Sequence, residues 1–89
     1  MQFSGARLKS EKGEVVADNV SGAITLPKRE TENRWGGRFE FESVHEVMAL
    51  ISRADQYFEL NIPSVLKGRI VLKNAAGDFL GIGNPEMYA

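Results

Sequence analysis

Apolar and polar residues alternate along most of the chain, and this two-residue period constrains the fold more than any other feature. Residues 20–26 (VSGAITL), 57–62 (YFELNI) and 68–73 (GRIVLK) show it clearly. Successive side chains of a β-strand point to opposite faces, so alternation is typical of strands with one packed and one solvated face. Antiparallel sheets are built from such strands. The sequence therefore predicts a mainly antiparallel β domain.

Seven short strands are expected from this pattern. Four come first, at residues 3–9, 14–19, 20–26 and 34–42, and three follow later, at residues 57–62, at residues 68–73 and in a last strand that ends at Ile82. Gly13 and Gly77 each allow a positive φ angle in a hairpin turn. Pro63 cannot donate to a central ladder and is expected to end its strand. Asp18 and Asn19 are expected to form a turn between the second and third strands.

One segment, residues 43–55 (SVHEVMALISRAD), follows a helical period instead. Its apolar residues recur three and four positions apart, as in a helix with one buried stripe. The predicted stripe consists of Val44, Val47, Met48, Ile51 and Ala54. Ser43 and Glu46 have the spacing of a capping box. We expect a helix over about residues 44–55, inserted after the fourth strand.

The fold class that follows is α+β, mainly antiparallel β, in one domain over residues 1–89. About six or seven strands are expected to form a small, strongly bent sheet or a partly open barrel, with the helix over one end or one face. Glycines inside the strands, such as Gly36 and Gly37, suit bulges or the close approach of a ring to bare backbone. Here the Trp35 indole would be that ring.

Composition excludes several classes of protein. The chain is 43% hydrophobic and 26% charged, with a net charge of −1, which is typical of a soluble globular domain and gives no basic arm. It has no cysteine, which favours a reducing compartment and excludes sulfur-based metal sites. No signal peptide and no apolar run of about 20 residues is visible. We expect a cytoplasmic protein of bacterial or phage-like compactness, with no membrane, metal or cofactor partner.

A basic and aromatic cluster in residues 27–43 (PKRETENRWGGRFEFES) supports two hypotheses. Single-strand binders combine cations with aromatic faces on which bases stack. On that hypothesis the nucleic-acid patch consists of Lys28, Arg29, Arg34, Trp35 and Arg38. However, Trp35 shares the parity of Phe39 and Phe41, which favours a core position. Glutamates also interleave with the basic residues, so the core interpretation is preferred.

No set of residues indicates catalysis. His45 is the single histidine, and no nucleophile or second ligand accompanies it at a useful spacing. We expect it to face solvent on the helix. The chain is therefore predicted not to be an enzyme.

Apolar residues on the outward faces suggest contact with a partner instead. Val71 and Tyr57 fall on the solvated side of their strands, and either Phe79 or the pair Leu80 and Ile82 is expected to be exposed. The predicted function is a binding or adaptor module acting through a protein partner or a homodimer. Its candidate surface comprises Arg34, Arg38, Tyr57 and Val71, with Trp35 beside it. A barrel that binds single-stranded nucleic acid and one that binds a small ligand between helix and sheet remain the alternatives.

Overall fold

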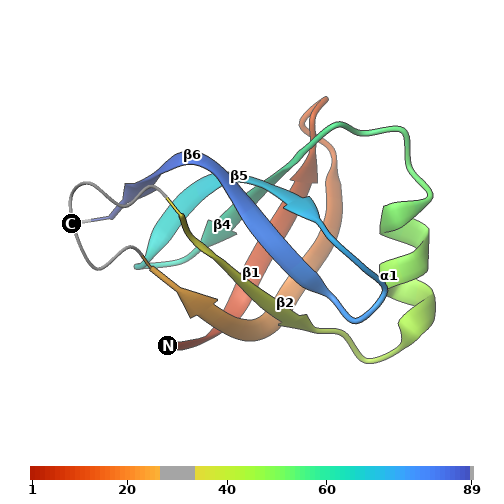
Figure 1. Ribbon diagram of the computed structural model, residues 1–89, viewed down its shortest axis with the longest axis horizontal. Helices are drawn as coiled ribbons and strands as arrows, with labels where there is room; N and C mark the ends of the chain where they lie inside the picture. Colours follow the sequence, from red (N-terminus) through yellow and green to blue (C-terminus); the bar gives the residue numbers. More distant parts are fainter. Residues whose placement is uncertain (27–33, 89) are drawn as a thin grey trace.

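The computed structural model describes residues 1–26 and 34–88 (Figure 1). Within them lie six strands and one helix. These are β1 (Gln2–Ser10), β2 (Val15–Thr25), β3 (Gly36–Glu40), α1 (Val44–Ile51), β4 (Phe58–Ile62), β5 (Leu66–Leu72) and β6 (Asp78–Met87). All pairings are antiparallel, and the strands close into a barrel in the order β1-β2-β3-β6-β5-β4. The predicted mainly antiparallel α+β fold is confirmed.

The barrel is closed, so the expectation of a partly open one is wrong. Closure depends on β1, which pairs with β2 on one edge and with β4 on the other. Register shifts interrupt the pairing of β1 with β2, and Gly5 has a φ of 68°. Such irregularities bend a strand and increase its twist. A bent β1 can therefore contribute to both sides of the closure.

The predicted second and third strands are one strand, β2, of 11 residues. The polar pair Asp18 and Asn19 is a local irregularity within it and not the turn predicted from the sequence. Asn19 has a φ of 54°, and the register with β1 shifts on either side of this position. The helix accordingly follows the third strand and not the fourth. Asparagine tolerates the left-handed region, so it can bend a strand without ending it.

Helix α1 is shorter than predicted and lacks the predicted capping box. It ends at Ile51 because the following residues leave it to contact the β1–β2 hairpin, where Asp55 Oδ2 accepts a hydrogen bond from the Glu11 backbone N–H at 3.0 Å. At its start the Ser43 side chain makes no capping bond, and the backbone N–H of Glu46 donates to the Ser43 carbonyl at 3.2 Å. The helix lies across one end of the barrel (Figure 1).

The buried face of α1 also differs from the predicted stripe. Val47 and Leu50 are the buried residues of the helix. Val44, Met48 and Ile51 are 57%, 51% and 42% exposed, and Ala54 is exposed beyond the helix end. A short helix lying over the end of a barrel contacts it along a narrow line, so only one residue per turn is covered. His45 is exposed, as predicted.

Strand β6 continues through the tail that was expected to be irregular after Ile82. Glu86 and Met87 pair with the start of β5, and Gly83, with a φ of 68°, lies in the interrupted stretch of that pairing. The turns at Gly13 and Gly77 and the end of β4 are as predicted, whereas β5 begins at Leu66 and not at Gly68. Gly13 and Gly77 have φ angles of 89° and 91° in their turns, and β4 ends at Ile62, before Pro63.

The core fills the barrel interior and includes the predicted tryptophan. Phe39 stacks on Phe79 with ring centroids 4.3 Å apart, and Trp35 is 2% exposed. The predicted shared face of Trp35 and Phe39 is therefore confirmed. The sequence suggested that the indole covers Gly36 and Gly37, and the structure shows it over two other glycines. It packs against Gly81 and against Gly68, where an added Cβ would lie 2.8 Å from the ring.

Candidate functional site

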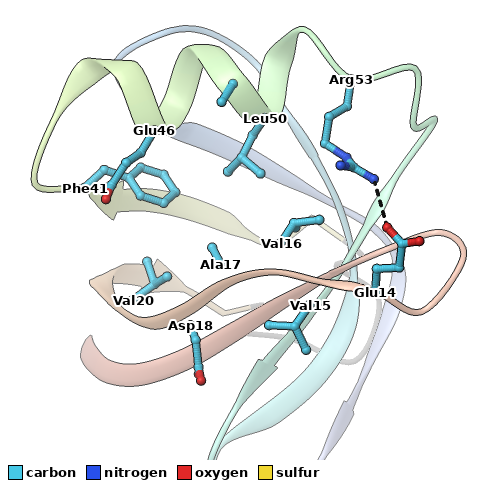
Figure 2. A pocket seen from close by; sticks show the side chains of 11 residues that line it. Glu14, Val15, Val16, Ala17, Asp18, Val20, Phe41, Glu46, Leu50 and Arg53 are labelled. Atoms are coloured by element: carbon cyan, nitrogen blue, oxygen red, sulfur yellow. Dashed lines mark ion pairs between the residues drawn. The ribbon is translucent and has the colours of Figure 1, made fainter.

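A groove of about 420 Å³ separates α1 from the first half of β2 (Figure 2). Val16, Ala17 and Val20 point from the strand toward the helix, and Leu50 points back toward them. Phe41 closes one end, and an ion pair between Arg53 and Glu14 crosses the other at 3.9 Å. The remaining lining residues are Val15, Asp18, Glu46 and Ala49. The floor is therefore apolar and the ends are charged.

The groove exists because β3 pairs with only half of β2. The ladder between them runs from Ser21 opposite Glu40 to Thr25 opposite Gly36. After Glu40 the chain turns away toward α1. Over residues 15–20, the pairing of β2 within the described chain is to β1 alone. One edge of this half-strand therefore faces the groove, where a continuous β3 would otherwise lie.

The hairpin end of the groove is held by a small polar cluster. The Arg53 Nε donates to Asp55 Oδ1 at 2.7 Å, and the Gln56 backbone N–H donates to a Glu11 carboxylate oxygen at 3.3 Å. Burial opposes the charge of Asp55, but hydrogen bonds from the Glu11 backbone and from Arg53 outweigh it, and the pKa of Asp55 lies below its usual value. The cluster fixes the distance between the helix end and β2, and so the width of the groove.

An acidic hollow of about 220 Å³ adjoins the Phe41 end of the groove and shares Asp18, Val20, Phe41 and Glu46 with its lining. Four carboxylates line it, from Asp18, Glu40, Glu42 and Glu46. Asp18 points away from the helix in Figure 2 and is paired with Arg7 at 3.3 Å. Hydrogen bonds from Arg7 and from the Asn19 backbone lower the pKa of Asp18. No salt bridge within residues 1–26 and 34–88 involves the three glutamates, so this end is a local excess of negative charge.

The four residues predicted as a partner surface do not share one hollow. Tyr57 and Val71 line a small one, of about 240 Å³, beside the end of α1. The Arg69 guanidinium carbon lies 4.6 Å from the centre of the Tyr57 ring, which is cation–π geometry. Arg34 is exposed and lines a separate hollow with Lys73. Arg38 lies on β3 and is paired with Asp78.

The predicted nucleic-acid patch is only partly visible. Trp35 is buried and its Nε1 donates to the Gly83 carbonyl at 2.8 Å, so its faces are covered by protein. Arg38 is engaged with Asp78, and Arg34 is exposed. Lys28 and Arg29 lie outside the described residues.

The pair of Arg38 and Asp78 ties β3 to the β5–β6 turn. Arg38 Nε lies 2.5 Å from Asp78 Oδ1, and the Asn74 amide donates to Oδ2 at 2.9 Å. The hydrogen bond from Arg38 has the largest effect and that from Asn74 the next largest, and together they lower the pKa of Asp78 from 3.8 to about 2. Arg38 in turn has a raised pKa because of Asp78.

The lowered pKa of Asp78 predicts that the fold loses stability over a defined range of acidic pH. A carboxyl whose pKa is lower in the folded state stabilises the fold when it is ionised in both states. Its contribution is complete above about pH 4 and is lost as pH falls through the folded value of about 2. We expect urea unfolding between pH 5 and pH 2 to show a smaller loss of stability for Asp78→Asn than for the natural chain. Parallel curves for the two proteins would show that Asp78 carries no such contribution.

None of the residues that line the groove was predicted as a site residue from the sequence. The signal that could have indicated the groove is the run Val15–Val16–Ala17, which breaks the alternation and places apolar side chains on both faces of one strand. A strand with apolar residues on both faces needs cover on both. In this chain the helix faces the side of the strand that carries Val16 and Ala17, whereas Val15, on the other side, remains 52% exposed (Figure 2).

Comparison with protein-family models, with curated proteins and with solved structures finds no match to this chain. Within the described residues, the structure contains no helix with the length and apolar character needed to cross a membrane. The same part of the chain contains no group of three or more acidic, histidine or cysteine side chains placed to hold a metal ion.

Proposed function

We propose that this chain is a non-enzymatic binding module that acts through contact with a protein partner, and that the groove between α1 and β2 is its binding site. The observation that carries the proposal is the half-paired strand β2, whose residues 15–20 border an apolar groove of about 420 Å³. Binding pockets commonly measure about 300–1,000 Å³ and are mostly apolar with a few placed polar groups. The α1–β2 groove has both properties.

The chemistry of the lining supports binding more than catalysis. Within residues 1–26 and 34–88, the groove is lined by carboxylates, one guanidinium and apolar side chains, without serine, threonine, histidine or lysine. Carboxylates can act as general bases or nucleophiles, but Glu14 and Asp18 of this lining are engaged in ion pairs with Arg53 and Arg7. Arg53, the one cation that the described part of the chain contributes to this lining, is engaged with Asp55 and Glu14. Its guanidinium therefore serves to hold the helix end in place.

The proposal is tested by a substitution that fills the groove, because such a variant should bind the partner more weakly. Peptides selected from a random displayed library with the natural chain are expected to bind Ala49→Trp at least about tenfold more weakly, a loss of about 1.4 kcal/mol. Ala49 is exposed on α1 and lines the groove, so a larger side chain there occupies the groove without entering the core. Isothermal titration of the selected peptides gives the affinities.

The matched control is Ala23→Trp. Ala23 is also an exposed alanine, but it lies in the half of β2 that pairs with β3, away from the groove. Selected peptides should bind this variant as tightly as they bind the natural chain, and thermal melting of both variants establishes that they fold. Equal binding to all three proteins would contradict the groove as the binding site.

Self-association is the second form that a protein contact could take. Leu80 and Ile82 are 40% and 44% exposed on β6, and Leu80 pairs with the half-buried Val71 of β5. A patch of this kind can be covered by a second copy. Sedimentation across a range of concentrations distinguishes the two forms, because a groove that binds another protein predicts a monomer. A small-ligand barrel would use the same groove and would respond to metabolites in a thermal-shift screen.

A further inference from the structure

The groove lies beside the part of β2 that β3 does not pair with. Antiparallel pairing with β2 stops at Ser21 opposite Glu40, and within the described chain the next residues of β2 have no partner on that edge. An exposed strand edge presents unpaired N–H and C=O groups and readily accepts another extended chain. An added strand here would continue the position of β3 along the barrel wall.

We propose that the α1–β2 groove binds an extended peptide segment, which pairs with β2 over about residues 15–18 and carries a basic residue at the Phe41 end. This inference rests on the proposed function and specifies the partner. The pairing is short, because Asn19, with a φ of 54°, interrupts the regular strand. Four residues of strand span about 13 Å at ~3.3 Å per residue.

The apolar lining of the groove determines which side chains of the bound segment can point into it. Val16, Ala17 and Val20 lie on one side of the groove and Leu50 on the other (Figure 2). In an added strand alternate side chains would point toward this floor, and the others would point to solvent. Small or β-branched apolar residues at every second position of the segment suit a groove of about 420 Å³. The partner is therefore expected to alternate apolar and polar residues.

The two ends of the groove differ in charge, and this difference determines the charge of the polar residues that the bound segment should carry. At the hairpin end Arg53 compensates Glu14. At the Phe41 end Glu40, Glu42 and Glu46 line one hollow, and no salt bridge in the described part of the chain involves them. Carboxylates close to one another attract a lysine or arginine of the partner and disfavour an acidic segment. The favoured occupant is a basic extended peptide.

Three capped hexapeptides test the inference by titration into the full chain. One alternates valine and lysine, the second alternates valine and glutamate, and the third is the lysine peptide with alternate backbone nitrogens methylated. The lysine peptide is expected to bind at least about tenfold more tightly than its methylated form, because methylation removes the N–H donors of strand pairing. It is also expected to bind more tightly than the glutamate peptide, with a preference that weakens as salt is added.

Variants of the chain separate the parts of the inference. Glu42→Gln combined with Glu46→Gln should weaken the lysine peptide by about two- to fivefold, as expected for exposed ion pairs. Both residues are exposed, so the fold is expected to tolerate the change. Ala49→Trp should abolish binding of the lysine peptide, and Ala23→Trp should leave it unchanged.

Each outcome decides one point. Equal binding of the methylated peptide would overturn strand pairing, and equal binding of the glutamate peptide would overturn the charge assignment. Failure of all three peptides to bind would overturn the inference as a whole. The proposed function would still be judged separately by library-selected peptides and their dependence on Ala49, since that selection assumes neither charge nor strand pairing.

Discussion

Replacing Trp35 with alanine is expected to lower the free energy of unfolding by about 3–5 kcal/mol, the usual cost of removing a large buried aromatic side chain. The indole is 2% exposed, and its ring covers the backbone of Gly68 and Gly81. Its Nε1 also donates to the Gly83 carbonyl at 2.8 Å. Removing the ring therefore leaves a cavity and an acceptor without its donor.

Urea unfolding measured by circular dichroism gives the size of the effect. The total stability of a chain of this length is only about 5–13 kcal/mol, so the loss is a large share of it and Trp35→Ala is expected to unfold at a clearly lower urea concentration than the natural chain. Trp35→Phe serves as the control, because it keeps an aromatic ring and loses the hydrogen bond, and it should fall between the other two proteins. A loss below about 1 kcal/mol for the alanine variant would contradict a buried indole.

Replacing Gly81 with alanine is expected to destabilise the fold by about 1–3 kcal/mol, although it adds a single methyl group. A Cβ at this position would overlap the fused part of the Trp35 indole. The backbone N–H of Gly81 donates to the Trp35 carbonyl at 2.7 Å, which holds the two segments together and prevents β6 from moving away. The cost arises from contact with a rigid ring, since Gly81 has no positive φ angle.

A double-mutant cycle with Trp35→Phe tests this explanation of the Gly81 effect. The smaller ring leaves room for the added methyl group, so Gly81→Ala should cost less in the Trp35→Phe background than in the natural chain. Residues in direct contact typically show coupling of about 0.5–3 kcal/mol in such cycles. Additive effects would show that the methyl group is destabilising for a reason unrelated to the indole.

The sequence predicted well those features that depend on neighbouring residues. Alternation located the strands, and the glycine turns placed the hairpins at Gly13 and Gly77. Parity placed Trp35 with Phe39 in the core. Each of these conclusions uses only the two-fold geometry of a strand or the freedom of one glycine, and such local properties do not depend on how the chain closes.

The features that the sequence did not predict depend on contacts between distant segments. Asn19 looked like a turn because asparagine is common in turns, but pairing to β1 keeps β2 continuous through it. Met48 and Ile51 matched a buried helical stripe, yet the end of the barrel is too narrow to cover them. Strand β6 continues past Ile82 because β5 pairs with Glu86 and Met87.

The candidate site was not predicted for the same reason. The residues singled out from the sequence were basic, aromatic or outward-facing on single strands, such as Arg38 and Val71. The groove arises where a paired half of β2 meets an unpaired half, and this depends on where β3 stops. No spacing within residues 14–20 specifies that point. The apolar run at residues 15–17 is the one local trace of it.

Chemical-shift mapping of a library-selected peptide on the ¹⁵N-labelled chain tests the central claim most directly. If the partner binds between α1 and β2, the largest changes will fall on amides of residues 15–20 and 49–53. The amides of Leu80 and Ile82, on the outer face of β6, will change little. Changes concentrated on Leu80, Ile82 and Val71, with residues 15–20 unaffected, would contradict a binding site in the groove.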